Sequence, residues 1–250
     1  YIITSLSVYL SLKLKNNTSA LSLTLSIWII WTIFFPKICG NAVEKIYPLP
    51  SRQVFKAVMK EDRSKGIDGH NPFDKRREEL KNKFLAEYNV DSLTQLPINF
   101  DGIVMQEDEE YGNLVWDKHF GNNYAILQKQ KSLYQISGFL NPFASLQSTS
   151  MGFCGTDMIH HIDFLRKAED YRRFLIKVLN DKHAYGGSKT GDWKWKVDNS
   201  FFKTVNDFTY DTPKIADFIK HYKMDIFCLI WWSALITIMI RVNINNNTIL

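Results

Sequence analysis

The stretch Asn141–Asn180, NPFASLQSTSMGFCGTDMIHHIDFLRKAEDYRRFLIKVLN, decides the fold. An apolar, uncharged run ends at Gly155, and an amphipathic pattern follows Thr156 and Asp157. Either residue can cap a helix, because a short side-chain oxygen accepts a free amide hydrogen of the first turn. The apolar positions recur at three- and four-residue steps and predict one buried stripe: His161, Phe164, Ala168, Tyr171, Leu175 and Val178. We therefore expect a mainly α fold.

A first apolar run, residues 16–36, carries no charge over about the twenty residues that cross a hydrocarbon core. A signal peptide is the competing interpretation, but it needs a small-residue cleavage site, and Pro36 and Lys37 follow instead. A retained membrane helix is therefore favoured, with its end at Pro36.

A second apolar run, Ile226–Ile240, lies between Asp225 and Arg241. It covers only about 22 Å at the helical rise, so flanking residues would have to extend it across a membrane. The alternative is a buried helix of a soluble domain, but the run is apolar on all sides and pairs with the first.

These patterns predict five parts and a C-terminal piece of a longer protein. We expect a truncated membrane helix and cytoplasmic turn at 1–15, a membrane helix at 16–40 and a helical extracytoplasmic domain at 41–223. A membrane helix at 224–242 and a disordered cytoplasmic tail at 243–250 follow. Lys13, Lys15 and Arg241 set this orientation, because short cytoplasmic loops are enriched in cations.

Within the central part, we expect helices at Arg52–Lys65, Asp74–Tyr88 and Glu107–Phe139, the first capped by Ser51. Leu96–Gly102 is expected to be an extended crossing or turn. The uncharged run Phe143–Phe153 suits a helix that lies in the membrane interface or is tucked under the domain.

The sharpest chemical signal is Asp157 with His160 and His161. Two imidazoles and a carboxylate could bind zinc or copper. The simpler interpretation is that Asp157 caps the helix, His161 edges the apolar stripe and His160 forms local hydrogen bonds. We favour it, because adjacent histidines on a regular helix do not both point at one ion. A metalloenzyme would also need a nucleophile or water, and no spacing supplies one.

Trp193 and Trp195 alternate with Lys194 and Lys196, as a strand with one aromatic and one basic face would. Trp193, Lys194 and Trp195 could contact a substrate or a lipid surface, or they could pack an irregular segment onto a helical core, which is favoured. The net charge of +5 is not gathered in one patch, so nucleic acid is not implied. Three cysteines are too few for a disulfide framework.

Several stretches, in order and spacing, resemble one group of proteins. They are Tyr47–Arg52, Pro97–Glu110, Asn141-Pro142, Gly155-Thr156-Asp157 with His160-His161, and Thr190-Gly191-Asp192-Trp193. The chain resembles bacterial ABC-type export permeases of the type-2 class that carry a large extracytoplasmic domain of uncharacterised role. The resemblance implies a multi-pass protein of the bacterial inner membrane that pairs with a second or related permease and with a cytoplasmic ATPase.

The sequence itself has no glycine-rich phosphate loop, so we expect a non-enzymatic subunit without a cofactor, with ATP hydrolysed by another chain. The alternative function is an extracytoplasmic sensor or ligand-binding module between two membrane spans. The uncharged segment Tyr1–Leu12 separates the two, because a third membrane segment suits a permease and not a two-span receptor.

Overall fold

A computed structural model describes residues 1–68, 70, 71, 73–192 and 194–247. The chain is helical, as predicted, and no strand occurs in these ranges. It forms two compact units. We call residues 1–49, 125–163 and 212–250 the apolar unit, and residues 50–124 and 164–211 the domain unit. The helices α6 (Phe100–Ile136) and α8 (Met158–Tyr185) contribute residues to both.

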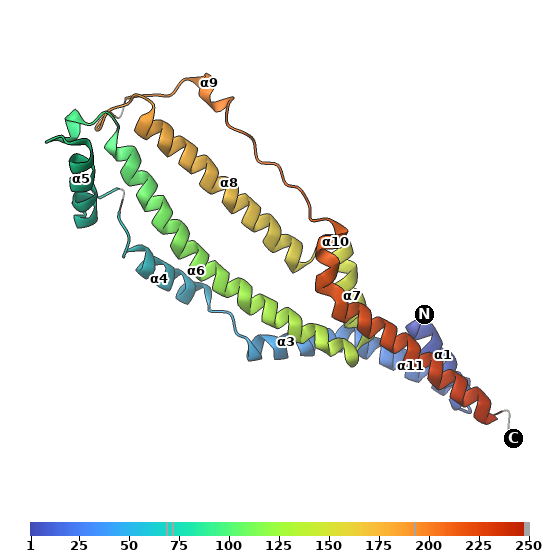
Figure 1. Ribbon diagram of the computed structural model, residues 1–250. Helices are drawn as coiled ribbons and strands as arrows, with labels where there is room; N and C mark the ends of the chain where they lie inside the picture. The colour runs from blue at the N-terminus through green and yellow to red at the C-terminus, as the bar shows by residue number, and fades with distance from the viewer. Residues whose placement is uncertain (69, 72, 193, 248–250) are drawn as a thin grey trace. The chain divides into compact units, whose positions relative to one another are not determined.

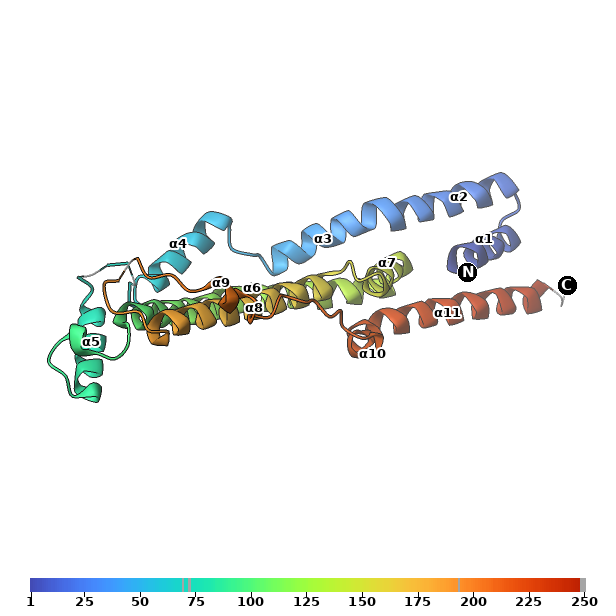
Figure 2. The ribbon, with the colours of Figure 1, turned by 90° about the horizontal axis from the view of Figure 1, so that it is seen from above.

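The apolar unit contains two helical stretches long and apolar enough to cross a membrane, Asn17–Ile46 and Ile215–Asn245. A shorter apolar helix, α1 (Ile2–Lys13), lies beside both of them (Figures 1 and 2). The remaining elements of the two stretches are α2 (Asn17–Ile29), a π-helical turn η1 (Ile30–Phe34), α3 (Phe35–Ile46), α10 (Ile215–Phe218), η4 (Ile219–Tyr222) and α11 (Lys223–Asn247).

The helix of the first stretch continues beyond Pro36 to Ile46. Proline has no amide hydrogen and crowds the preceding turn, and a π-helical turn accommodates both effects. The backbone carbonyl of Trp31 in that turn accepts a hydrogen bond from Asn141 Nδ2 at 2.8 Å. The fully buried Asn141 therefore ties the turn to the start of α7 (Pro142–Phe153), which it also caps through the Phe143 amide.

The uncharged helix α7 packs against α11 and buries its small residues there, including Ala144, Ser145 and Gly152. A side chain at Gly152 would collide with the Tyr222 ring, because an added Cβ would lie 2.5 Å from Cζ. The prediction of a disordered tail is wrong as far as Asn247, since α11 remains helical to that residue.

The domain unit is built around a small apolar core at the start of α6. Its helices are α4 (Arg52–Arg63), α5 (Lys75–Tyr88), the 3-10 turn η2 (Leu93–Gln95) and α9 (Asn199–Phe202). Ser51 and Asp74 cap α4 and α5. The core comprises Leu96, Ile98, Phe100, Ile103, Val104 and Ala184, with Leu80, Phe84 and Leu85 of α5 packed against it.

The predicted extended segment Leu96–Gly102 is wrong at its end, because α6 already begins at Phe100. Asn99 Oδ1 accepts the Asp101 amide at 2.9 Å and so caps the helix. Gly102 allows α6 to approach the end of α8, since an added Cβ would lie 2.7 Å from the backbone nitrogen of Ala184. The helix thus begins directly after Pro97 and Asn99, which had indicated a turn.

The single buried stripe predicted for α8 is also wrong. His161 and Phe164 are exposed, and the other members of the stripe are only half-buried. Phe164 instead contacts Phe208 and Tyr210, and Tyr171 contacts Phe208. An extended segment therefore covers this side of α8 in place of a second helix, and such a cover is thinner than a helical layer.

Candidate functional site

The apolar unit contains a buried set of charged and polar side chains, which we call the polar cluster: Lys131, Asp157, His160, Tyr222 and Asp225. Its centre is Asp157. The carboxylate caps α8, accepting the amides of Ile159 at 3.1 Å and His160 at 3.2 Å. It also accepts hydrogen bonds from the Tyr222 hydroxyl and from Nδ1 of the His160 ring. One side chain therefore joins the start of α8 to η4.

Lys131 on α6 lies beside Asp157 and the Tyr222 ring. Its Nζ is 3.7 Å from Asp157 Oδ2 and 4.0 Å from the centre of the Tyr222 ring. Asp225, in the first turn of α11, accepts hydrogen bonds on Oδ2 from Gln135 at 2.5 Å and Ser148 at 3.1 Å. Lys131 Nζ and Asp225 Oδ1 have no hydrogen-bond partner within the described part of the chain. The cluster thus links four elements through charge.

The surroundings shift the pKa values of the groups outside α11. Burial alone would raise the pKa of Asp157, but hydrogen bonds from Tyr222, the His160 ring and two backbone amides outweigh it and lower the value to about 2. Burial lowers the pKa of Lys131, and attraction to Asp157 and Asp225 partly opposes that shift. Asp157 is therefore held ionised as the common acceptor of the cluster.

The predicted metal candidates separate in the structure. Asp157 and His160 meet, whereas His161 is exposed. His160 also packs edge-on against Phe218, with ring centres 4.9 Å apart. No group of three or more His, Cys, Asp and Glu side chains among the described residues is arranged to hold a metal ion. The geometry matches the simpler interpretation of Asp157 as a cap and His160 as its local partner.

A family model described as DUF3526, a domain of unknown function, matches residues 52–211. The chain belongs to this family. No curated protein and no solved structure matches it. The DUF3526 region contains Lys131, Asp157 and His160, and the candidate span Ile215–Asn245 contains Tyr222 and Asp225. The polar cluster therefore joins the family region to the candidate second span.

The second predicted site lies near the end of the DUF3526 region. Trp195 is half-buried, and its ring packs edge-on against His183, with centres 5.9 Å apart. Lys194 is exposed, and Trp193 lies outside the described residues. The structure thus gives Trp195 a packing contact, and a role of these residues in binding a substrate or lipid remains a prediction.

Asn99, which is 1% exposed, holds the loop after α8 by hydrogen bonds at the same end of the DUF3526 region. Its Nδ2 donates to Ser188 Oγ at 2.9 Å and to the Lys189 carbonyl at 3.0 Å. Asp101 accepts the Gly191 amide at 2.9 Å and forms an ion pair with Arg77 at 2.6 Å. These bonds give the Thr190-Gly191-Asp192 motif a structural role, because they close the loop after α8 over the start of α6.

Sequence reasoning missed three members of the polar cluster. Lys131 belongs to a charged helical stretch that is typical of a solvated face, and Asp225 has the place of an ordinary flanking charge before a membrane span. The absence of charged residues in α7 was the one available signal, because such a helix can pack over buried polar groups, and Ser148 of α7 donates to Asp225. No pattern in the sequence indicates that Lys131 and Asp225 belong to the same cluster.

Proposed function

We propose that this chain is part of the permease subunit of an ATP-binding-cassette exporter, with the DUF3526 region outside the cytoplasm over the mouth of the pore. In this proposal, Asn17–Ile46 and Ile215–Asn245 cross the bacterial inner membrane. Lys13, Lys15 and Arg241 lie on the cytoplasmic side, in keeping with the enrichment of cations in short cytoplasmic loops.

The observation that carries the proposal is the packing of α1. This apolar helix lies against both α2 and α11, so three apolar helices associate in the apolar unit (Figures 1 and 2). Trp31 and Trp232 pack edge-on at 5.3 Å between the two candidate spans, and Trp232 Nε1 donates to the Gly138 carbonyl at 2.9 Å. A multi-helix assembly of this kind favours a permease over a receptor with two separate spans.

The polar cluster supports a mechanical role for the DUF3526 region. Asp157 connects Lys131 of α6, the start of α8 and Tyr222 of η4 through an ion pair and hydrogen bonds. Lys131, Asp157 and His160 would move together with Tyr222 and Asp225 at the head of the second span. Binding of a substrate or partner to the DUF3526 region would then displace the second span as well.

Three partners follow from the proposal. The sequence has no phosphate-binding loop, so ATP hydrolysis belongs to a separate cytoplasmic ATPase, and this subunit is not itself an enzyme. A second copy or a related permease would complete the pathway, and membrane lipid would cover the exposed apolar side chains of α2 and η1, such as Leu21, Ile33 and Phe34.

The test is purification of the full-length parent protein from membranes in mild detergent, with mass spectrometry and an ATPase assay on the product. We expect a nucleotide-binding subunit to co-purify with vanadate-sensitive ATP turnover. A preparation without ATPase but with a kinase or another signalling output on the same chain, or bound to it, would replace the exporter with a sensor.

A further inference from the structure

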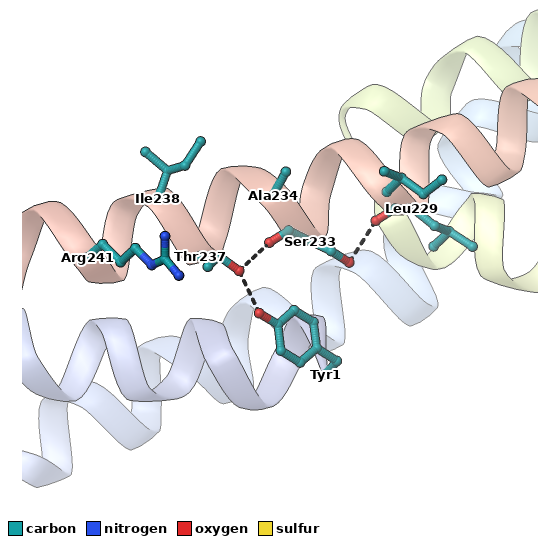
Figure 3. Close-up of a pocket in the computed structure, with 8 residues that line it drawn as sticks. Tyr1, Leu229, Ser233, Ala234, Thr237, Ile238 and Arg241 are labelled. Carbon is teal, nitrogen blue, oxygen red and sulfur yellow. Dashed lines mark hydrogen bonds between the residues drawn. The ribbon is translucent and has the colours of Figure 1, made fainter.

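A groove of about 660 Å³ runs along α11 in the apolar unit. It is lined by Tyr1, Leu229, Ile230, Ser233, Ala234, Thr237, Ile238 and Arg241, all of which except Ile230 are labelled in Figure 3. Ile230 and Ile238 are 63% and 59% exposed. A neighbouring cavity of about 410 Å³ shares Tyr1, Leu229 and Ser233 with it, so the apolar surface continues toward α7.

The hydroxyl groups in the groove are satisfied within the protein. Ser233 donates to the Leu229 carbonyl at 2.8 Å and Thr237 to the Ser233 carbonyl at 2.7 Å. The Tyr1 hydroxyl is 2.5 Å from Thr237 Oγ1 and donates to it, because the hydrogen of Thr237 is already engaged. The groove therefore offers an occupant an apolar surface with no unsatisfied hydroxyl.

One end of the groove is cationic. Arg241 is exposed there, and α1 runs alongside α11 toward the same end, where Lys13 and Lys15 follow (Figures 1 and 2). Residues 1–43 and 226–250 contain no Asp or Glu, so no carboxylate from either segment balances these three charges. Basic sites between membrane helices on the cytoplasmic side are typical binding sites for anionic lipid headgroups.

The length of the groove suits one acyl chain. Leu229 to Arg241 spans about 18 Å of helix, slightly more than half of a hydrocarbon core of about 30 Å. One acyl chain reaches from a headgroup at the surface to the middle of the bilayer.

We propose that this groove binds an anionic phospholipid, with its phosphate at Arg241 and one acyl chain along Leu229, Ala234 and Ile238. The inference rests on the membrane insertion that the proposed function includes. It adds a specific lipid site on the side of the membrane opposite the DUF3526 region.

The experiment is native mass spectrometry of the full-length protein, purified in mild detergent from membranes containing phosphatidylglycerol and phosphatidylethanolamine. The test variants are Arg241→Gln, which removes the cation, and Ala234→Phe, which fills the groove. The matched controls are Lys223→Gln, at the opposite end of α11, and Ser22→Phe, on an exposed face of α2.

Wild type and both controls should retain phosphatidylglycerol, and each test variant should lower its retention about five-fold. Equal retention in all variants would overturn the site. A loss with Ala234→Phe but not with Arg241→Gln would overturn the anionic headgroup. A photo-crosslinking residue at position 238 should label phospholipid, and labelling of another protein segment or a second copy would also overturn the proposal.

Carbonate extraction of the same membranes separates the two proposals. A chain that is washed out of the membrane contradicts the permease itself. A chain that stays in the membrane, co-purifies with its ATPase and retains no phosphatidylglycerol contradicts only the lipid site.

Discussion

The two units differ in where their large apolar side chains lie, although both bury carboxylates. The apolar unit exposes Leu21, Ile33 and Phe34 and buries Asp157 and Asp225. The domain unit buries Phe100 and Val104, and its buried carboxylate Asp101 is paired with Arg77 at 2.6 Å. Exposed apolar side chains are stable in lipid but not in water, so the first unit suits a membrane and the second suits water. A buried carboxylate needs partners in either solvent.

The largest expected effect contrasts the two kinds of apolar residue. Phe100→Ala should cost the domain unit about 3–5 kcal/mol, because it leaves a cavity in the small core. Leu21→Ala should change stability in detergent very little, because Leu21 is 68% exposed. Hydrogen exchange of the full-length chain measures both. A comparable loss of protection in the two variants would contradict the division into differently solvated units.

A smaller effect is expected from the centre of the polar cluster. Asp157→Ala removes the cap of α8 and leaves buried partners unpaired, which should cost about 2–3 kcal/mol. Asp157→Asn keeps a capping oxygen and should cost less. Thermal unfolding in detergent measures the series, with Asp170→Ala on the exposed face of α8 as the control. A cost for Asp157→Ala no larger than that of the control would show that the cluster is not stabilising.

Acid should affect the apolar unit through Asp157. Its pKa in the folded chain, about 2, is below the ordinary 3.8, so its contribution to stability is complete above 3.8 and is lost as the pH falls toward 2. We expect the melting temperature to fall over this interval, and Asp157→Asn to reduce that fall. An unchanged pH profile in Asp157→Asn would assign the acid sensitivity to other groups.

The smallest effect is expected from the surface ion pairs of the domain unit. Asp117 is exposed and accepts two hydrogen bonds from Arg173, at 2.7 Å and 3.0 Å. Asp117→Asn should cost less than about 1 kcal/mol, and high salt should remove the difference, because exposed charges are screened. Chemical unfolding of the wild type and of Asp117→Asn at low and high salt measures this difference in stability. A loss of stability in Asp117→Asn larger than that in Asp157→Ala would contradict the expectation that the exposed ion pair contributes less than the buried cluster.

Local patterns predicted most of the helices but not their partners. The caps at Ser51 and Asp157 and the helices behind them follow from side-chain chemistry within four residues. The start of α6 at Phe100 was missed, because Pro97 and Asn99 signal a turn until the loop at 188–191 closes over them. The exposed His161 was misplaced for a related reason: periodicity shows that a face is apolar but not what covers it.

The sequence alone determined the helical class, the two long apolar stretches and a pair of candidate caps for α8, Thr156 and Asp157, because each depends on neighbouring residues. Only the tertiary structure brought Lys131, Asp157, Tyr222 and Asp225 together and laid α1 along α11. Those contacts join residues far apart in the chain, and hydrogen bonds between buried polar groups are strengthened once the fold excludes water around them. No local pattern records that exclusion.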